Sequence, residues 1–387
     1  MHLEIKMDRN IELRKNLIAN CRQIVVKAGT RLLTDSQKIA ALVNEIAYLR
    51  QKKFQVILVT SGAVGMGMKV LGLAKRPRKL AEVQALAAIG QGKLMEIYER
   101  ECAAHGIRTA QLLLTASDLR SRTRYINVMN CINALWENDV LPIVNENDSV
   151  SVDELKFGDN DILSAMLGSL TGSQLTVILT TESGLRERDA EGKLADRISV
   201  VGKLSDSIRA MAQGTDNAEF SIGGMSSKLR AANLLMSAGG HLWIADGREA
   251  GVLHDIADGK DIGTLFLPRP QKIHSRKLWI GFFAKCAGKL LVDAGAAEAL
   301  IAKGRSLLPS GVKEIEGRFR RGDTVEIVSI ENPSEVIARG LVNFDSDECN
   351  KIILHKSGEI AEILKRDADE EVVHRDNLVL LDKGVEM

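Results

Sequence analysis

The chain has 387 residues and a formal net charge of +1, with 45% hydrophobic and 27% charged residues. This ordinary globular balance fits about two domains and leaves nucleic-acid binding open, because a basic patch can be local. The five cysteines form no CxxC pair and the seven histidines lack a metal-binding spacing, which argues against a disulfide framework or a zinc site. No apolar run opens the chain or approaches the ~20 residues of a membrane span, so we expect a cytoplasmic protein without a membrane partner.

Residues 1–20 form an N-terminal extension in which both charge signs mix with apolar residues. From Gln23 to about Asp246, short continuous apolar runs alternate with segments of helical period. Continuous runs are typical of strands that are buried on both faces of a parallel sheet. The predicted strands are 24–26, 56–59, 111–114, 141–144, 177–179 and 242–244.

Helical patterns separate these strands. The first has apolar residues that follow the 3.6-residue period between 39 and 49, with Thr34, Asp35 or Ser36 as the N-cap. Strand–helix alternation predicts an α/β domain over 21–268, built on a doubly wound, mainly parallel sheet with right-handed crossovers. Further helices are predicted over about 80–105, 122–138 and 161–171.

A domain boundary follows at Pro268 and Pro270, because prolines disfavour the continuation of any element. We expect a linker at 269–273 and a small mixed, mainly β domain over 274–387. Its predicted strands are 277–283, 289–292, 324–328 and 336–342, and its one clear helix is 296–303.

Unusual segments lie where predicted strands end, and parallel α/β sheets bind ligands beyond the carboxyl ends of their strands. Lys27 follows the first strand and Gly29 comes two residues later, so an ammonium group and backbone N–H groups there suit phosphate oxygens. Residues 60–67, Thr-Ser-Gly-Ala-Val-Gly-Met-Gly, fit an anion site at a helix N-terminus. The structural alternatives are a strand-ending surface lysine and a glycine-rich packing turn.

Three later segments add polar groups. Residues 145–148, Asn-Glu-Asn-Asp, follow a buried strand, where polar side chains are costly unless they meet a ligand or each other. In residues 157–161, Phe-Gly-Asp-Asn-Asp, Asp161 either caps a helix or orients an ammonium group, a lysine or Mg²⁺-bound phosphate. Residues 223–228 open another helix with Gly-Gly-Met-Ser-Ser-Lys, and Lys228 could join Lys27 in clamping a transferring phosphoryl group.

In their order and spacing, these segments resemble the amino-acid kinase family, and its glutamate 5-kinase branch in particular. The matching segments are VVKAGT, LVTSGAVGMG, PIVNENDSV, FGDNDILSA and GGMSSKLRAA. The stretch from GKLLVDAGAAEAL to RRGDTVEI resembles the PUA domain that many of these kinases carry. The resemblance implies ATP-dependent phosphorylation of the L-glutamate γ-carboxylate to γ-glutamyl phosphate, the first step of proline biosynthesis.

The resemblance also implies roles for individual residues. Lys27 and Lys228 would contact the ATP phosphates and stabilise the transition state, with Asp161 orienting both lysines. Asp159 would pair with Asp161 in an acidic pair, and Gly62 would supply a backbone donor. The residues implied to bind glutamate are Ser61, Asp148 and Asn160. The residues implied to bind ATP are Lys27, Gly29, Thr180, Thr181, Gly223, Gly224 and Lys228.

Three positions depart from the family pattern. Thr181 stands where the family has Asp, Ile222 where it has Thr, and Arg186 where it often has Tyr. All three fall on the nucleotide side. A lost charge-assisted hydrogen bond is worth ~1.5–3 kcal/mol, which predicts a raised nucleotide KM rather than an inactive enzyme.

The expected cofactors are ATP and Mg²⁺, with no protein ligands assigned to the metal. A homo-oligomer is expected from the family, and the product would pass to the next reductase of the proline pathway. Two alternatives are another carboxylate or phosphate kinase of the same fold, and a weakened kinase with a regulatory or RNA-binding role. The second rests on the nucleotide-side departures and on a locally basic tail, whose residues are Lys272, Arg276, Lys277, Lys285, Lys303, Arg305, Arg318, Arg320 and Arg321.

Overall fold

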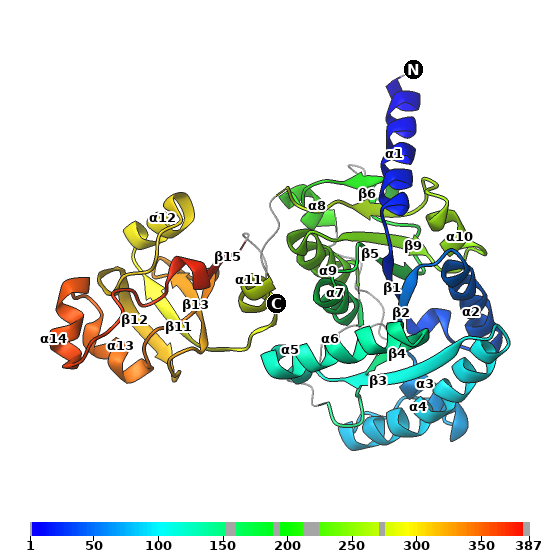
Figure 1. Cartoon of the computed structure of the whole chain (residues 1–387), viewed down its shortest axis with the longest axis horizontal. Coiled ribbons are helices and arrows are strands. Elements are labelled where there is room, and N and C mark those ends of the chain that lie inside the picture. Colours follow the sequence, from blue (N-terminus) through cyan, green and yellow to red (C-terminus); the bar gives the residue numbers. More distant parts are fainter. Residues whose placement is uncertain (1, 152–159, 189–193, 212–223, 271–274, 382–387) are drawn as a thin grey trace. The chain divides into compact units, whose positions relative to one another are not determined.

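The computed structural model describes residues 2–151, 160–188, 194–211, 224–270 and 275–381. The chain divides into two compact units, Met1–Lys272 (the first unit) and Ile273–Met387 (the second unit), whose elements Figure 1 labels. Each unit has its own hydrophobic core. No described helix combines the length and the apolar character needed to cross a bilayer. The residues singled out from the sequence that lie outside the described ranges are Phe157, Gly158, Asp159, Ser221, Ile222, Gly223 and Lys272.

An eight-stranded sheet forms the centre of the first unit, in the order β3-β4-β2-β1-β5-β9-β10-β8. Strands β3, β4, β2, β1, β5 and β9 run parallel, whereas β10 is antiparallel to β9 and parallel to β8. The parallel strands contain every apolar run predicted above, so the predicted mainly parallel sheet is confirmed. The strands are β1 (Gln23–Ala28), β2 (Gln55–Val59), β3 (Arg108–Leu114), β4 (Val140–Glu146), β5 (Leu175–Thr180), β8 (Val200–Val201), β9 (His241–Asp246) and β10 (Thr264–Phe266). A separate short hairpin is formed by β6 (Arg186–Arg188) and β7 (Leu194–Arg197).

Helices cover both faces of this sheet, as a doubly wound fold requires (Figure 1). Because successive side chains of a strand point to opposite faces, β1 contributes side chains to both faces of the sheet. Its residues Ile24, Val26 and Ala28 pack in one core cluster with residues of α2 and α4, whereas Lys27 reaches α7. The predicted cap Asp35 accepts a hydrogen bond from the Lys38 backbone at 3.0 Å and starts α2. The helices are α2 (Ser36–Gln51), α3 (Ala63–Val70), α4 (Leu80–Ala103), α5 (Ala116–Arg120), α6 (Arg122–Glu137), α7 (Asn160–Thr171), α8 (Asp206–Met211), α9 (Met225–Ala238) and α10 (Val252–Ala257).

Helices α3 and α4 approach each other closely because glycines lie between them. A Cβ atom on Gly67 would overlap the backbone of Leu86, and one on Gly90 would overlap the carbonyl of Ala63. Helix α3 itself begins after Gly62, whose φ of 98° lies in the left-handed region that favours glycine. This contact holds α4 beside the turn that follows β2.

The N-terminal extension, which the sequence left without a role, forms helix α1 (His2–Ala19). Its Arg14 is fully buried, donates to the Ser199 carbonyl at 2.8 Å and lies 3.2 Å from the Asp261 carboxylate. The guanidinium also stacks over the Trp243 ring, 4.9 Å from the ring centroid. Burial lowers the pKa of Arg14 to about 10, although Asp261 opposes this shift. Arg14 therefore fastens α1 to late segments of the first unit.

The second unit is built on a five-stranded sheet in the order β12-β11-β13-β14-β15, in which only the β11–β13 pair is parallel. The predicted strand over Lys277–Phe283 is wrong: α11 (Ser275–Leu278) continues there into the π-helical turn η3 (Trp279–Phe283). Buried Ile280 and Phe283 explain the apolar run, which periodicity alone could not assign to a strand or a helix. The strands are β11 (Cys286–Val292), β12 (Val312–Gly317), β13 (Thr324–Ser329), β14 (Asn332–Leu341) and β15 (Leu378–Leu380). The other helices are α12 (Ala294–Lys303), α13 (Ser346–Ile352) and α14 (Ile360–Leu364).

Candidate active site

The carboxyl ends of the parallel strands gather the predicted site residues at one edge of the sheet. Lys27 is the penultimate residue of β1, and Ser61 lies two residues beyond the end of β2. The N-termini of α7 and α9 meet these strand ends. Helix N-termini carry partial positive charge and free N–H groups, so this edge favours anionic ligands.

Asp161 holds two lysine side chains, one on each carboxylate oxygen. Lys27 Nζ lies 2.6 Å from Oδ1 and Lys228 Nζ lies 3.0 Å from Oδ2. Asp161 is fully buried, and each lysine side chain is only 7% exposed. Ser227 Oγ also donates to Oδ2 at 3.3 Å. Lysine side chains are flexible, so a shared buried carboxylate fixes where their charges lie. The result is a compact cluster with one net positive charge.

Asn160 forms the centre of a second polar group, directly beside Asp161 in the chain. Its Nδ2 donates to the Thr60 carbonyl at 2.6 Å, to Ser61 Oγ at 2.8 Å and to Asn145 Oδ1 at 3.0 Å. Its own Oδ1 is buried and has no hydrogen-bond partner. Two of the residues implied to bind glutamate, Ser61 and Asn160, are therefore in direct contact. The third, Asp148, lies half-buried in the turn that follows β4.

Those residues implied to bind the nucleotide that the structure describes lie at the ends of β1 and β5 and at the start of α9. Gly29 follows β1, and a Cβ atom there would lie 3.5 Å from Lys27 Nζ. Gly224 precedes α9 in an extended conformation. Thr180 ends β5, and Thr181 follows it.

Sequence reasoning missed two residues at this edge, Asp246 and Arg248. Arg248 Nη2 donates to the Thr181 carbonyl at 2.6 Å and to Asp246 Oδ2 at 2.6 Å, while its Nε donates to Asp246 Oδ1 at 2.9 Å. Hydrogen bonds from this guanidinium lower the pKa of Asp246. The available signal was an acidic residue at the end of β9, which is also a strand of the ligand-binding edge. Arg248 thus supports the loop in which Thr181 replaces the family's Asp.

The described residues do not form a protein cage for Mg²⁺. No group of three or more His, Cys, Asp or Glu side chains gathers within the described ranges. Asp161, the predicted acidic residue at the site, already has both oxygens on lysines.

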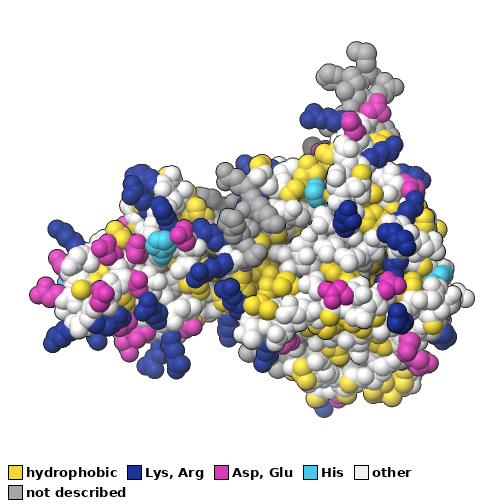
Figure 2. Space-filling view, viewed as in Figure 1, with side chains coloured by type: hydrophobic (Ala, Val, Ile, Leu, Met, Phe, Trp, Pro, Cys, Tyr) yellow, Lys and Arg dark blue, Asp and Glu magenta, His cyan; other side chains and the backbone are white. Residues whose placement is uncertain are grey.

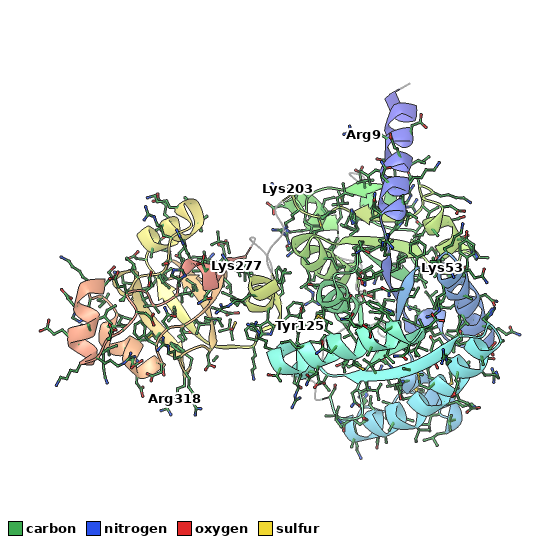
Figure 3. The ribbon with its side chains drawn as sticks, in the orientation of Figure 1. Arg9, Lys53, Tyr125, Lys203, Lys277 and Arg318 are labelled. Carbon is green, nitrogen blue, oxygen red and sulfur yellow. The ribbon has the colours of Figure 1, made fainter. Side chains whose placement is uncertain are left out.

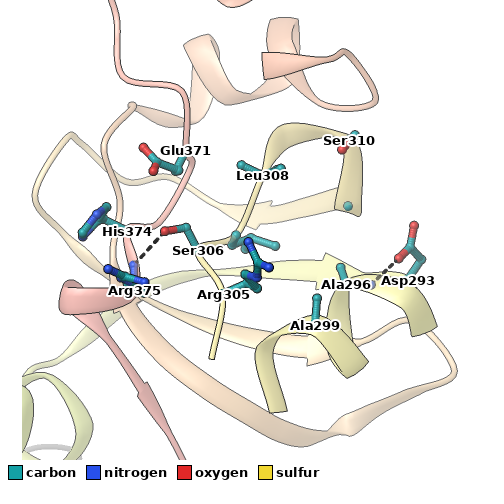
Figure 4. A pocket seen from close by; sticks show the side chains of 12 residues that line it. Asp293, Ala296, Ala299, Arg305, Ser306, Leu308, Ser310, Glu371, His374 and Arg375 are labelled. Atoms are coloured by element: carbon teal, nitrogen blue, oxygen red, sulfur yellow. Dashed lines mark hydrogen bonds between the residues drawn. The ribbon is translucent and has the colours of Figure 1, made fainter. Parts of the chain in front are cut away.

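The second unit contains a cavity of about 610 Å³ beside α12 (Figure 4). Arg305, His374 and Arg375 line it, together with Asp293 and Glu371. The Arg375 backbone donates to Ser306 Oγ at 3.1 Å across the cavity wall. Both charge signs are present, so the lining is not a uniformly basic surface.

Comparison with known proteins identifies the class. The model of the amino acid kinase family matches residues 22–246, and that of the PUA domain matches residues 288–364. The cluster around Asp161 and every strand of the sheet except β10 lie within the first match. The C-terminal sheet, apart from its first two residues and β15, lies within the second.

Several similar proteins share nearly the full length. Glutamate 5-kinase from Thermoanaerobacter sp. (strain X514) is 45% identical over 369 residues, which cover 94% of this chain and 98% of that protein. Glutamate 5-kinase from Desulfotalea psychrophila is 45% identical over 378 residues, which cover 96% of this chain and 100% of that protein. Glutamate 5-kinase from Caldanaerobacter subterraneus subsp. tengcongensis is 46% identical over 369 residues, with 94% and 98% covered. The chain therefore belongs to the amino acid kinase family and, within it, to the glutamate 5-kinases.

Proposed function

We propose that this enzyme transfers the γ-phosphoryl group of ATP to the γ-carboxylate of L-glutamate. A carboxylate oxygen of glutamate attacks the γ-phosphorus, and the bond from that phosphorus to the bridging oxygen of ADP breaks. The products are γ-glutamyl phosphate and ADP. No general base is needed, because the attacking carboxylate is ionised near neutral pH.

The observation that carries this proposal is the pair of buried lysines on one carboxylate. Lys27 and Lys228 each lie within 3.0 Å of Asp161, so their charges are fixed before ATP binds. The transferring group carries charge on its equatorial oxygens, and two preorganised ammonium groups would offset that charge in the transition state. Asp161 is then a positioning residue that keeps the two like charges together.

Glutamate would bind on the other side of the transferring group. Asn160 and Ser61, which are hydrogen-bonded at 2.8 Å, offer polar atoms to the amino-acid backbone of glutamate. Asp148 would take the α-ammonium group as a counter-charge. Gly29, Thr180, Thr181, Gly223 and Gly224 would surround the nucleotide, and Mg²⁺ would enter with ATP.

The test is formation of an acyl phosphate in the presence of hydroxylamine, which traps the product as a hydroxamate. We expect hydroxamate with ATP and glutamate, and none with aspartate or N-acetylglutamate. Product with either of the other acids at a comparable rate would contradict the assigned substrate. No product with glutamate and any nucleotide, from folded protein, would contradict the kinase activity itself.

The proposal extends to the cell. γ-Glutamyl phosphate is an activated acyl group, suited to reduction, so we propose that a reductase of the proline pathway consumes it. A homo-oligomer and a cytoplasmic location accompany this proposal. Analytical ultracentrifugation of the purified chain would test the oligomer, and a single monomer species would contradict it.

The relatives do not favour the alternative of an RNA-binding protein with a weakened kinase. The visible face of the second unit carries acidic and basic side chains interspersed (Figure 2). Nucleic-acid sites are typically dominated by positive charge. We therefore propose no RNA partner.

A further inference from the structure

Three amide side chains, two of them buried and that of Asn160 half-buried, form a continuous row behind the proposed glutamate side of the site. Asn160 Nδ2 donates to Asn145 Oδ1 at 3.0 Å, and Asn145 Nδ2 donates to Gln91 Oε1 at 2.8 Å. Asn145 Oδ1 also accepts from the backbone N–H of Glu146 at 2.9 Å. We call Gln91, Asn145 and Asn160 the amide row. It joins α4, the end of β4 and the start of α7.

The amide row has a direction. Each side-chain amide has a donor end and an acceptor end, and each contact sets the orientation of the next group. With Gln91 Oε1 facing Asn145, the donor end of Asn145 is occupied and its acceptor end turns to Asn160. Asn160 Nδ2 donates to groups of the protein. Its acceptor Oδ1 is therefore the atom that can bind a ligand.

Two atoms of the row are buried without a hydrogen-bond partner, Gln91 Nε2 and Asn160 Oδ1. Gln91 is only 8% exposed. Buried polar atoms are nearly always paired, so an unpaired one calls for a partner such as a ligand or an ordered water. Asn160 also contacts Ser61, another residue implied to bind glutamate. An N–H group of the substrate could therefore donate the missing hydrogen bond to Asn160 Oδ1.

Helix α4 holds the neighbouring strand end in the same way. Tyr98 lies two turns after Gln91, on the same side of α4, and is fully buried. Its hydroxyl lies 2.9 Å from Thr60 Oγ1, and the Thr60 carbonyl accepts from Asn160. Burial raises the pKa of Tyr98, so this hydroxyl stays neutral and keeps its hydrogen bond throughout the physiological range.

We propose that Gln91 is a positioning residue for the amino-acid substrate. Through Asn145 it orients Asn160 so that Asn160 Oδ1 accepts a hydrogen bond from the α-ammonium group of glutamate. This inference rests on the proposed function and adds a residue that does not itself contact the substrate. Because the row lies on the glutamate side, Gln91 acts on the binding of glutamate and not on that of ATP.

The experiment measures both KM values and kcat by the hydroxamate assay. The Gln91→Met variant keeps the length of the side chain and removes the acceptor. We expect its glutamate KM to rise about tenfold or more, because Asn145 is left with an unpaired buried donor, and its ATP KM to stay within about twofold. The Gln91→Asn variant cannot span the distance to Asn145, so it carries the same expectation if the Met variant does not fold.

Two further variants separate positioning from general stability. Gln91→Glu keeps an acceptor at the same reach and should hold the glutamate KM within about threefold of the parent, far below the value for Gln91→Met. Leu94→Met changes a fully buried α4 residue whose side chain forms none of the hydrogen bonds of the row, so its glutamate KM should not move.

The outcomes are distinct. If the parent enzyme forms no hydroxamate with glutamate, the proposed function fails and this inference fails with it. If the parent is active and the folded Met or Asn variant keeps the parent's glutamate KM, only the role of Gln91 is overturned. The role of Gln91 would also be overturned if Gln91→Met raised the ATP KM as much as the glutamate KM. The same holds if Leu94→Met raised the glutamate KM as much as Gln91→Met does, because either result indicates general loosening of the fold.

Discussion

Asp161 shares its carboxylate between Lys27 and Lys228, so two like charges lie within contact of one anion. Without that anion the two ammonium groups would repel each other in a setting with little water. In the proposed mechanism, this arrangement keeps the positive charges in place before ATP arrives. Catalysis of this kind depends on where positive charge lies at the moment of transfer.

Lys228→Ala tests this arrangement at the level of one side chain. We expect kcat to fall by roughly a hundredfold or more, because a preorganised donor is lost from the transition state, with the glutamate KM changed little. Lys203→Ala, at an exposed lysine of the same unit (Figure 3), is the matched control and should keep the parent kcat. Near-normal turnover of Lys228→Ala would contradict a catalytic role.

The cysteines give a second prediction, which depends on pH. All five are free thiols; Cys21, Cys102 and Cys349 are buried, whereas Cys131 is exposed. Burial raises the pKa of Cys21 to about 12 and that of Cys102 to about 11. A raised pKa keeps a thiol neutral, and the thiolate is the reactive form. At pH 8, iodoacetamide should therefore label Cys131 long before Cys21 or Cys102, as measured by mass spectrometry of the native protein. Rapid labelling of all three without denaturant would contradict the buried core.

The sequence singles out the residues whose surroundings are local, and it misses those whose partners come from another element. Lys27 and Lys228 stand out because each lies at a strand end or near a helix start, whereas the roles of Ser61 and Asn160 follow only from the resemblance to the family and stay predictions. Gln91 was missed because it occupies a buried position of α4 and meets Asn145, which lies 54 residues away in the chain. Arg248 was missed because its partner Thr181 lies 67 residues earlier. No local pattern reveals such pairs.

At the scale of elements, the contact between α3 and α4 holds α4 beside the turn after β2, where we propose that glutamate binds. Gly67 and Gly90 let the two helices approach at backbone distance. The residue after Gly90 is Gln91. The contact that packs the two helices therefore also fixes the position of Gln91, the α4 member of the amide row.

Gly90→Ala should push the two helices apart. We expect it to lower the free energy of unfolding by roughly 1–3 kcal/mol or more, since the new methyl group meets backbone that cannot move aside. Gly92→Ala, two residues later with nothing within 4 Å of its Cβ position, is the control and should stabilise the helix by roughly 0.5–1 kcal/mol. Urea unfolding measures both. Equal stability of the two variants would contradict the close approach.

Helices and strands can be predicted from the sequence where the hydrophobic periodicity is clear. They are predicted poorly where the segment is too short to show a period. The parallel strands and α2, α4, α6 and α7 follow clear patterns and lie where the sequence predicts them. Residues 277–283 were assigned to a strand because an apolar run of this length fits either a strand or a buried helix. Helices α13 and α14 were missed because each is too short for its period to be read.

At the scale of the whole molecule, the two units have separate cores, one around β1 and α2 and the other around β11 and β13. Separate cores allow separate unfolding transitions. Tryptophans report on each unit: Trp136 and Trp243 belong to the first, and Trp279 belongs to the second.

Ile327→Ala removes a fully buried side chain from the core of the second unit. We expect it to destabilise that unit by about 2–5 kcal/mol and to leave the midpoint of the first unit unchanged. Calorimetry should then resolve a transition that moves down and one that does not. In a variant with Trp136 and Trp243 replaced by Phe, the fluorescence of Trp279 would follow the second unit alone. It would show whether the transition that moves belongs to that unit. A common shift of the entire unfolding curve would contradict independent units.

The burial of Arg14 has a consequence for synthesis on the ribosome. Helix α1 emerges before the other elements of the first unit, yet the carboxylate that compensates the Arg14 guanidinium belongs to Asp261, made 247 residues later (261 − 14). At ~5–20 residues per second, that interval lasts roughly 12–50 seconds. During this time Arg14 has no anion to accompany it into the interior, so the nascent α1 is expected to stay in water. Helix α1 is made before the other elements of its unit and is therefore expected to be among the last of them to dock.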